Sequence, residues 1–298
     1  MIGQQTLFKD LFDNHGWTVV APKFEQTLSE DELVELVPQF DGWIIGDDPA
    51  TERVVIAGSS GRLRAAVKWG VGTDNVNFDA FAALEIPVAN TPGMFGSEVA
   101  DIATGYVIGL ARETFLIDRE VRVGHWPKPS GISLAGKKVG VVGFGDIGTQ
   151  TVRRLSACGM SVAVYDPFVD SVPDRVELRL WPTGVGDLDF IVFTCALTEA
   201  NRFMLNEKVL ANCKMGVRIV NVARGPLIDE ASLIEAQKRG HVHSCALDVF
   251  ESEPLALQSP LKDNPRNILG SHNASNTIDA VVRTSAIAIE QLATYLAR

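Results

Sequence analysis

Short apolar runs alternate with segments of helical periodicity along almost the whole chain. In the first ninety residues the helical segments cover Gln4–His15, Ser29–Val37 and Glu52–Ala57. Acidic residues follow Ser29, as they often follow the N-cap of a helix. Such an alternation is typical of a parallel sheet with helices on both faces. The apolar runs predicted to form its strands are Thr18–Val20, Trp43–Ile45, Ala66–Trp69 and Val88–Asn90.

A second series of the same kind follows. The pattern first predicts one long helix from Ser97, which would cap it, to Val123, and then a loop rich in glycine and proline. The strands after this loop lack strict alternation, which indicates burial on both faces. Two domains fit a chain of 298 residues. The predicted strands are Lys138–Val142, Ser161–Tyr165, Phe190–Thr194, Arg218–Asn221, Cys245–Asp248 and Asn267–Leu269. The predicted helices are Ile147–Ala157, a short one near Asn206–Leu210, Glu230–Arg239 and Asn276–Arg298.

The composition of the chain argues against several classes of protein. With 27 Lys and Arg against 37 Asp and Glu, the formal net charge is −10, which argues against a general nucleic-acid binder. No apolar run reaches the roughly 18 residues needed to span a bilayer, and the first residues do not resemble a signal peptide. The cysteines never form a CxxC pair, so we expect no zinc site and no disulfide framework, but the buried reduced thiols of a cytoplasmic protein. These cysteines are Cys158, Cys195, Cys213 and Cys245.

A glycine-rich turn carries the first candidate site. The predicted strand at 138–142 leads into Gly143-Phe144-Gly145-Asp146-Ile147-Gly148 and then into a predicted helix. In a turn of this kind Gly143 permits the tight bend, Gly145 lets a pyrophosphate approach the backbone, and Gly148 lets the helix pack close to the strand. The N-terminus of the helix then offers free N–H groups to the phosphates. The turn therefore predicts dinucleotide binding.

An acid at the end of the next predicted strand refines this prediction. Asp166 lies eighteen residues beyond Gly148. A carboxylate there accepts hydrogen bonds from the adenosine ribose and repels a 2′-phosphate, which favours NAD over NADP. The alternative is a solvated side chain before a proline.

Three polar residues follow three of the predicted strands. They are Arg224, Glu253 and His272. Ligands of an open parallel sheet bind beyond the carboxyl ends of its strands. Arg224 is suited to bind a carboxylate through two parallel N–H bonds, His272 to transfer a proton, and Glu253 to orient the imidazole. Taken singly, each is also compatible with a surface or structural role. His241 and His243 are too close together and too isolated to predict a metal site.

These segments together resemble the D-isomer-specific 2-hydroxyacid dehydrogenases, which include phosphoglycerate dehydrogenases and hydroxypyruvate or glyoxylate reductases. The matching segments occur in the order typical of that family and cover nearly the whole chain. They are Lys68–Asn75, Val88–Gly93, Val99–Asp101, Gly143–Gly148, Asn221–Gly225, Leu247–Pro254 and Ser271–Ala274.

The resemblance implies roles for individual residues. Arg224 would bind the substrate carboxylate and polarise the carbonyl, and His272 would be the acid or base, paired with Glu253. The backbone around Val71 and Gly72 would hold the carboxylate from the other domain. The positions expected to touch NAD are Gly143, Gly145, Asp146, Ile147, Gly148, Asp166, Cys195, Ala223 and Asp248, of which Asp248 would face the nicotinamide carboxamide.

The resemblance also implies an α/β architecture of two doubly wound parallel-sheet domains. A Rossmann domain for NAD, residues 91–275, would be inserted into a flavodoxin-like substrate domain made of residues 1–90 and 276–298. Members are typically homodimers through the cofactor domain, and the helix from Ser97 would take part.

The chain departs from the family pattern in three places. The apolar strand that normally opens the family is replaced by the helical segment Gln4–His15, so the strand is absent or begins upstream. Asp47-Asp48 stands where phosphoglycerate dehydrogenases carry phosphate-binding arginines, which disfavours a phosphorylated substrate unless Arg62, Lys68 or a partner subunit compensates. Asp48 could instead cap the next helix. The helix usual at Glu177–Gly186 is expected to be short or irregular.

The sequence therefore predicts an NAD-dependent dehydrogenase that interconverts a small D-2-hydroxy acid and its 2-keto acid. Two alternatives stay open. One is a dehydrogenase of an unusual acid, such as a phosphonate or a sugar-derived acid. The other is an NAD(H)-sensing binding protein of the corepressor type, because fold alone does not fix function.

Overall fold

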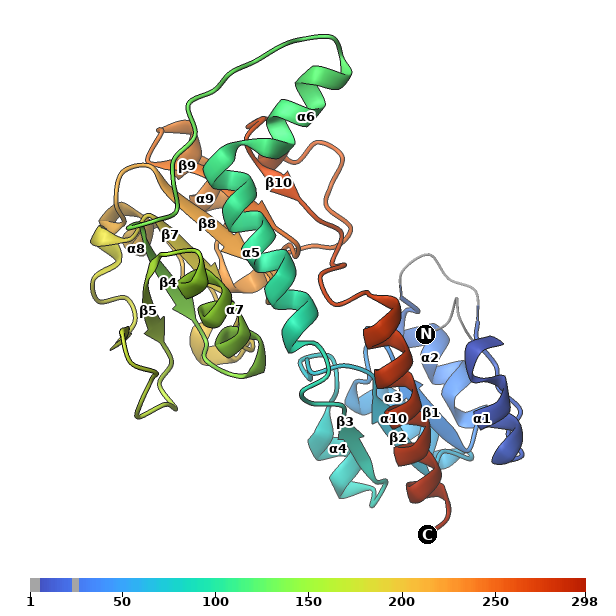
Figure 1. Ribbon diagram of the computed structural model, residues 1–298. Coiled ribbons are helices and arrows are strands. Elements are labelled where there is room, and N and C mark those ends of the chain that lie inside the picture. The colour runs from blue at the N-terminus through green and yellow to red at the C-terminus, as the bar shows by residue number, and fades with distance from the viewer. Residues whose placement is uncertain (1–5, 23–26) are drawn as a thin grey trace. The chain divides into compact units, whose positions relative to one another are not determined.

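The computed structural model describes residues 6–22 and 27–298 and divides into two compact units (Figure 1). Unit 1 comprises Met1–Phe95 and Asn276–Arg298, and unit 2 comprises Gly96–Ser275. Each unit contains one parallel sheet with helices on it. The α/β fold class predicted from the alternating pattern is confirmed.

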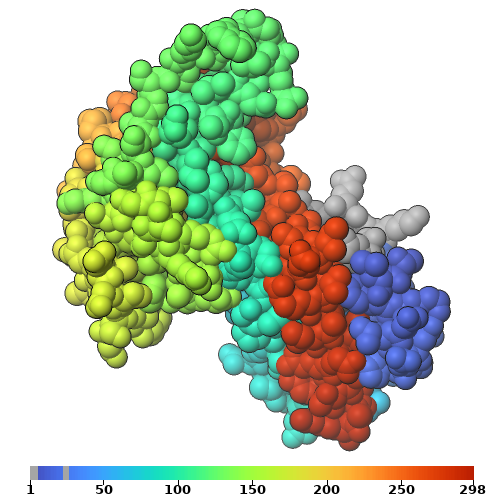
Figure 2. All heavy atoms as spheres, in the orientation of Figure 1, coloured from blue at the N-terminus to red at the C-terminus, as the bar shows by residue number. Residues whose placement is uncertain are grey.

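The sheet of unit 1 has the strand order β1-β2-β3. Helix α10 packs against β1 and β2 (Figure 1) and lies beside α1, as Figure 2 also shows. Successive side chains of β2 point to opposite faces of the sheet. Ala65 and Val67 contact α10, and Ala66 belongs to the hydrophobic core on the other face. The strands are β1 (Gly42–Ile45), β2 (Ala65–Lys68) and β3 (Val88–Asn90). The helices are α1 (Lys9–Asn14), α2 (Glu30–Leu36), α3 (Glu52–Ser60), α4 (Phe78–Ala83) and α10 (Ile278–Leu296).

Helix starts in unit 1 follow the expected side-chain chemistry. The Ser29 hydroxyl accepts from the backbone N–H of Glu32, and the Glu32 carboxylate accepts from the N–H of Ser29, so α2 begins with a capping box. Thr51 caps α3 and Thr277 caps α10 in the simpler way. The predicted start of α2 is confirmed.

The first predicted strand is wrong. Thr18–Val20 forms no strand, and Val19 and Val20 are 42% and 54% exposed. Among the described residues β1 pairs only with β2, and a cavity of about 750 Å³ is lined by Thr18–Pro22 and by Gly42–Ile44. A run of apolar residues forms a strand only where a neighbouring strand exchanges backbone hydrogen bonds with it. Here β1 does not pair with Thr18–Val20. The helix predicted over Gln4–His15 is shorter, and Gln4 itself lies outside the described residues.

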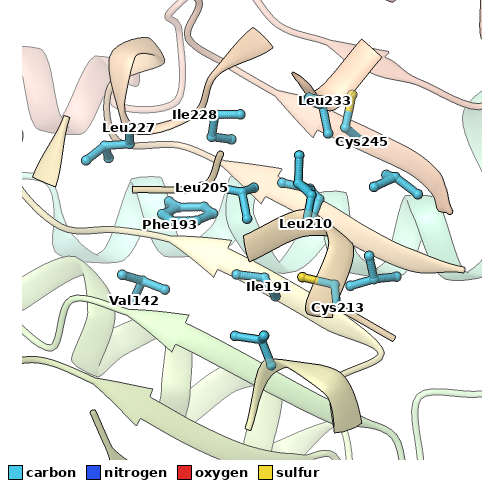
Figure 3. Packing of buried hydrophobic residues seen from close by; sticks show 14 of the residues in the cluster. Val142, Ile191, Phe193, Leu205, Leu210, Cys213, Leu227, Ile228, Leu233 and Cys245 are labelled. Atoms are coloured by element: carbon cyan, nitrogen blue, oxygen red, sulfur yellow. The ribbon is translucent and has the colours of Figure 1, made fainter. Parts of the chain in front are cut away.

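Unit 2 carries a seven-stranded sheet with the order β10-β9-β8-β7-β4-β5-β6. Helices α8 and α9 cover the face that bears Ile191 and Phe193, where the main core lies (Figure 3), and α5 and α7 pack on the sheet from the other side. The strands are β4 (Lys138–Val142), β5 (Ser161–Tyr165), β6 (Val176–Arg179), β7 (Phe190–Phe193), β8 (Val217–Asn221), β9 (Val242–Leu247) and β10 (Ile268–Leu269). The helices are α5 (Gly96–Arg112), α6 (Thr114–Arg122), α7 (Asp146–Ala157), α8 (Glu207–Asn212) and α9 (Glu230–Lys238).

Two predictions for unit 2 need correction. The segment Glu177–Gly186, where a short or irregular helix was expected, contains only a single 3₁₀ turn at Val185–Asp187, but strand β6 at 176–179, which overlaps the start of this segment, was not predicted. The long helix from Ser97 to Val123 is broken at Glu113, whose φ of 55° is left-handed. Helical periodicity continues across the break, but the buried Glu113 carboxylate turns toward Arg266 and stops the helix. Ser97 lies within α5 and its hydroxyl accepts from Arg154 instead of capping.

No helix in the described part of the chain is both long enough and apolar enough to cross a membrane.

Candidate functional site

The three polar candidates of unit 2 follow three neighbouring strands. Arg224 comes after β8, Glu253 after β9 and His272 after β10, and these strands lie side by side in the sheet. Gly225 packs directly on the next loop, because a Cβ there would lie 1.9 Å from the carbonyl carbon of Phe250. The chain therefore brings the candidates to the carboxyl-terminal edge of one sheet, where ligands of such sheets bind.

Glu253 and His272 form a direct pair. His272 Nδ1 lies 2.7 Å from Glu253 Oε2, and the other carboxylate oxygen, Oε1, accepts from the backbone N–H of Phe250 at 2.9 Å. The carboxylate is thus fixed on both sides. It favours the tautomer with the proton on Nδ1, in which Nε2 is the acceptor nitrogen. The imidazole is 34% exposed, so solvent and small molecules reach it.

The backbone of His272 is held in an uncommon conformation. Its φ is 54°, a left-handed value that a side chain with a Cβ rarely adopts. Its N–H donates to the carbonyl of Asp248 at 2.7 Å, and the Asp248 carboxylate accepts from the N–H groups of Asn273 and Ala274. Asp248 therefore fixes the turn that carries the histidine.

Arg224 is half-buried at the end of β8. Asn221, the last residue of that strand, donates its amide to the Arg224 carbonyl at 2.8 Å and accepts from the N–H of Ala223 at 3.0 Å. The Arg224 guanidinium donates to the Ala223 carbonyl at 2.9 Å through Nη1. An anchored guanidinium of this kind is suited to bind a carboxylate.

The glycine-rich turn fits a dinucleotide. A Cβ on Gly143 would lie 2.6 Å from the backbone of Cys195, and one on Gly148 would lie 2.0 Å from the Gly143 carbonyl, so both positions require glycine. A Cβ on Gly145 would meet nothing within 4 Å, and Gly145 caps α7 without a side-chain hydrogen bond. The open approach and the uncapped helix start are what a pyrophosphate needs.

Asp166 directly follows β5 and is hydrogen-bonded to the backbone of the glycine-rich turn. Its carboxylate accepts from the N–H of Phe144 at 2.7 Å and from the N–H of Phe168 at 2.9 Å. Acceptor positions remain on both oxygens for a ribose. Burial raises the pKa of the Cys195 thiol to about 12, so Cys195 is not a nucleophile. Asp146 is exposed at the start of α7 and its carboxylate packs against Gly96, while Ile147 is partly buried and Ala223 is buried.

The predicted substrate residues of the other unit follow β2. Val71 is 44% exposed, and Gly72 is partly buried. The neighbouring Lys68 is almost completely buried, donates to the carbonyl of Gly46 at 2.6 Å and lies 3.4 Å from Asp47. Asp48 does not cap α3, because Thr51 does, and its carboxylate accepts instead from the N–H of Leu28. Burial and the charge of Asp47 raise the pKa of Asp48.

Two residues that matter for this site were not anticipated. Asn221 holds the loop of Arg224 by a hydrogen bond to its carbonyl, and Tyr106 of α5 forms a hydrogen bond with the Asp248 carboxylate. Finding Tyr106 would have needed a contact between distant parts of the sequence, whereas Asn221 lies only three residues before Arg224, in the same segment. The part of the chain that the structure describes holds no group of three histidine, cysteine, aspartate or glutamate side chains arranged for a metal ion.

Comparison with known proteins gives a consistent result. A family model described as "D-isomer specific 2-hydroxyacid dehydrogenase, NAD binding domain" matches residues 104–274. A hydroxypyruvate reductase of Thermotoga maritima is 32% identical over 270 residues, which cover 89% of this chain and 88% of that protein. A D-3-phosphoglycerate dehydrogenase of Methanocaldococcus jannaschii is 33% identical over 279 residues, and this chain spans only 51% of its length. The crystal structure of the TT0316 protein from Thermus thermophilus has a TM-score of 0.90 and 27% identity, with 97% of this chain and 93% of that chain covered.

Proposed function

The chain belongs to the D-isomer-specific 2-hydroxyacid dehydrogenases, a family of NAD-dependent oxidoreductases, and we propose that Arg224, Glu253 and His272 carry its reaction on a small, unphosphorylated 2-keto acid. The observation that supports these roles best is the 2.7 Å contact between His272 and Glu253 at the strand end next to that of Arg224.

The cofactor site is assigned to the glycine-rich turn. Gly143, Gly145 and Gly148 would cradle the pyrophosphate, and Asp166 would accept from the ribose. When bound, NAD supplies the hydride acceptor for oxidation of the hydroxy acid, and NADH supplies the hydride for reduction of the keto acid. Ile147, Cys195, Ala223 and Asp248 stay predicted cofactor contacts, as does Asp146.

We assign the transfer of the proton to and from the substrate oxygen to His272. In the reductive direction Nε2 of the protonated imidazole donates to the carbonyl oxygen, and in oxidation the neutral imidazole removes the hydroxyl proton. Glu253 holds Nδ1 and stabilises the imidazolium. Arg224 binds the carboxylate through parallel N–H groups and places the adjacent carbonyl carbon for reaction. The backbone at Val71 and Gly72 is proposed to bind the same carboxylate.

The charges of unit 1 favour an unphosphorylated substrate. The Asp47 side chain is 73% exposed at the carboxyl end of β1, and the buried Lys68 ammonium pairs with it. Arg62 forms an ion pair with Asp41. Both cations thus have carboxylate partners, and the exposed carboxylate of Asp47 would repel a phosphate.

A panel of keto acids tests this proposal. Purified protein is mixed with NADH and, in turn, glyoxylate, pyruvate, hydroxypyruvate, 2-oxoglutarate and phosphohydroxypyruvate, and loss of NADH absorbance is followed. We expect turnover of at least one unphosphorylated acid and a lower kcat/KM for phosphohydroxypyruvate. A preference for the phosphorylated acid would contradict the substrate class. Silence across the panel with retained NADH binding would favour an unusual substrate or a sensing role.

A homodimer is proposed for the assembly. Helix α6 has no buried residue, and the segment that follows it runs along unit 2 without regular structure (Figure 1). Phe115, Val121, Val123 and Trp126 are 43%, 41%, 68% and 77% exposed. An apolar surface of this kind is typical of an interface. Light scattering should give twice the chain mass of 32.2 kDa, and a monomer mass would contradict the proposal.

A cytoplasmic location is also proposed. All four cysteines are free thiols, which is typical of a reducing compartment. Only Cys213 and Cys245 are buried, and the other two are partly exposed. Thiol titration of protein isolated from its own cells should find four thiols, and fewer would contradict this location.

A further inference from the structure

Tyr106 lies inside α5, far in the sequence from the residues of the site. Its side chain is 9% exposed, and its hydroxyl donates to the carboxylate of Asp248. Burial and the charge of Asp248 raise the pKa of Tyr106 well above its ordinary value. The phenol is therefore a neutral donor at any physiological pH, and the carboxylate is its acceptor.

Asp248 is a buried carboxylate that serves the turn carrying His272. It is 3% exposed. Its Oδ1 lies 3.2 Å from the N–H of Asn273 and its Oδ2 lies 2.8 Å from that of Ala274, while its own carbonyl accepts from the N–H of His272. Three consecutive amides thus depend on one residue. A carboxylate so used needs all its donors, because a partly satisfied buried charge is costly.

Gly270 allows the three segments to meet. A Cβ at this position would lie 2.2 Å from Asp248 Oδ1 and 2.6 Å from the Tyr106 hydroxyl oxygen. Helix α5, the end of β9 and the end of β10 therefore converge on the carboxylate with no room for a side chain between them. The left-handed backbone of His272 lies two residues farther on, at φ 54°.

We propose that Tyr106 is a positioning residue for His272 that acts through Asp248. Its hydroxyl fixes the orientation of the carboxylate, the carboxylate fixes the amides of Asn273 and Ala274, and these hold the imidazole on Glu253. The inference rests on the proposed role of His272 in proton transfer. A strained turn keeps its conformation only while its surroundings determine it, and Tyr106 supplies one of those constraints.

The test is Tyr106→Phe, which removes only the hydroxyl. We expect kcat for the best keto acid to fall about tenfold, the scale of one hydrogen bond to a charged group. Tyr165→Phe is the matched control, because Tyr165 is also buried in unit 2 and its hydroxyl donates to the carbonyl of Thr183 instead. Equal kcat values for both variants would overturn the proposal.

A double-mutant cycle separates positioning from general damage. In the His272→Ala background, Tyr106→Phe should cause no further loss, because there is no imidazole to position. A further tenfold loss in that background would mean that Tyr106 acts elsewhere, and would overturn the proposal.

Hydrogen exchange supplies a readout that does not depend on activity. The amides of His272, Asn273 and Ala274 should exchange about tenfold faster in Tyr106→Phe than in wild type, and at the wild-type rate in Tyr165→Phe. Unchanged protection would overturn the positioning role even if no substrate is found. Faster exchange together with wild-type turnover by His272→Ala would instead remove the proposed function of His272 and leave the structural link in place.

Discussion

Two groups of histidine, glutamate and arginine side chains lie at opposite ends of the same three strands of unit 2, and the glutamate of one group comes from the break between α5 and α6. The first follows the strands and has a short contact, 2.7 Å, between imidazole and carboxylate. The second lies where the strands begin, and its imidazole is 3.7 Å from the carboxylate. The first group is Arg224, Glu253 and His272, and the second is Glu113, Arg218, His243 and Arg266.

The surroundings give the second group a different chemistry. Burial first, and then the charge of Arg218, lower the pKa of His243 to about 4, and Arg266 acts in the same direction against Glu113. His243 is therefore neutral near pH 7, and the Glu113 carboxylate binds Arg266 at 3.2 Å. Similar side chains thus make a partly exposed pair, proposed here for proton transfer, in one place and a structural cluster in the other, and we infer that position on the sheet decides between them.

The largest effect should come from exchanging the two histidines for alanine. We expect His272→Ala to lower turnover about a hundredfold or more and to keep NADH binding, since it removes only the proton-transfer group. His243→Ala should keep turnover close to wild type. Steady-state kinetics and NADH fluorescence titration check both, and an equal loss in the two variants would remove the distinction.

Arg224 and Arg218 should differ in the same way, in the loss of kcat/KM that follows their substitution. Arg224→Lys keeps the charge but not the parallel N–H groups, so we expect kcat/KM for the keto acid to fall about tenfold to a hundredfold. Arg218→Lys changes a side chain that donates to the carbonyl of Leu110, and should leave kcat/KM near the wild-type value. If Arg218→Lys costs as much kcat/KM as Arg224→Lys, anion binding does not reside at Arg224.

The smallest effect concerns stability against pH. The pKa of His243 is about 4 when folded and about 6.5 when unfolded, so between these values the unfolded chain binds more protons. The free energy of unfolding should then rise with pH from 4 to 6.5, by about 3 kcal/mol for this group, and level off above. His243→Gln should lack this contribution. Urea unfolding of both proteins at several pH values checks it, and parallel curves would refute it.

The sequence predicted most of unit 2 because its strands are buried on both faces and its turns need glycine. The glycine turn and the three strand-end residues each have a local signal in the sequence, such as the spacing of Gly143, Gly145 and Gly148 after an apolar run. The break at Glu113 has no such signal, since helical periodicity runs through it and the cause is an ion pair between the buried Glu113 carboxylate and the more exposed Arg266. Tyr106 has no local signal either, because in the sequence it fits an ordinary apolar position of a helix.

The errors in unit 1 have another origin. Val19 and Val20 have the composition of a strand, but pairing depends on a neighbour that sequence pattern does not supply. The role of Asp48 was equally open, because a carboxylate before a helix caps it or serves another backbone amide, and only the fold shows that it accepts from Leu28.

The central claim is that the imidazole of His272 transfers the proton, and chemical rescue tests it most directly. Free imidazole is added to His272→Ala, with NADH and the best keto acid of the panel. We predict that the slow turnover of this variant rises with imidazole concentration, while wild type and His243→Ala do not respond. Wild-type turnover by His272→Ala without imidazole would contradict the account.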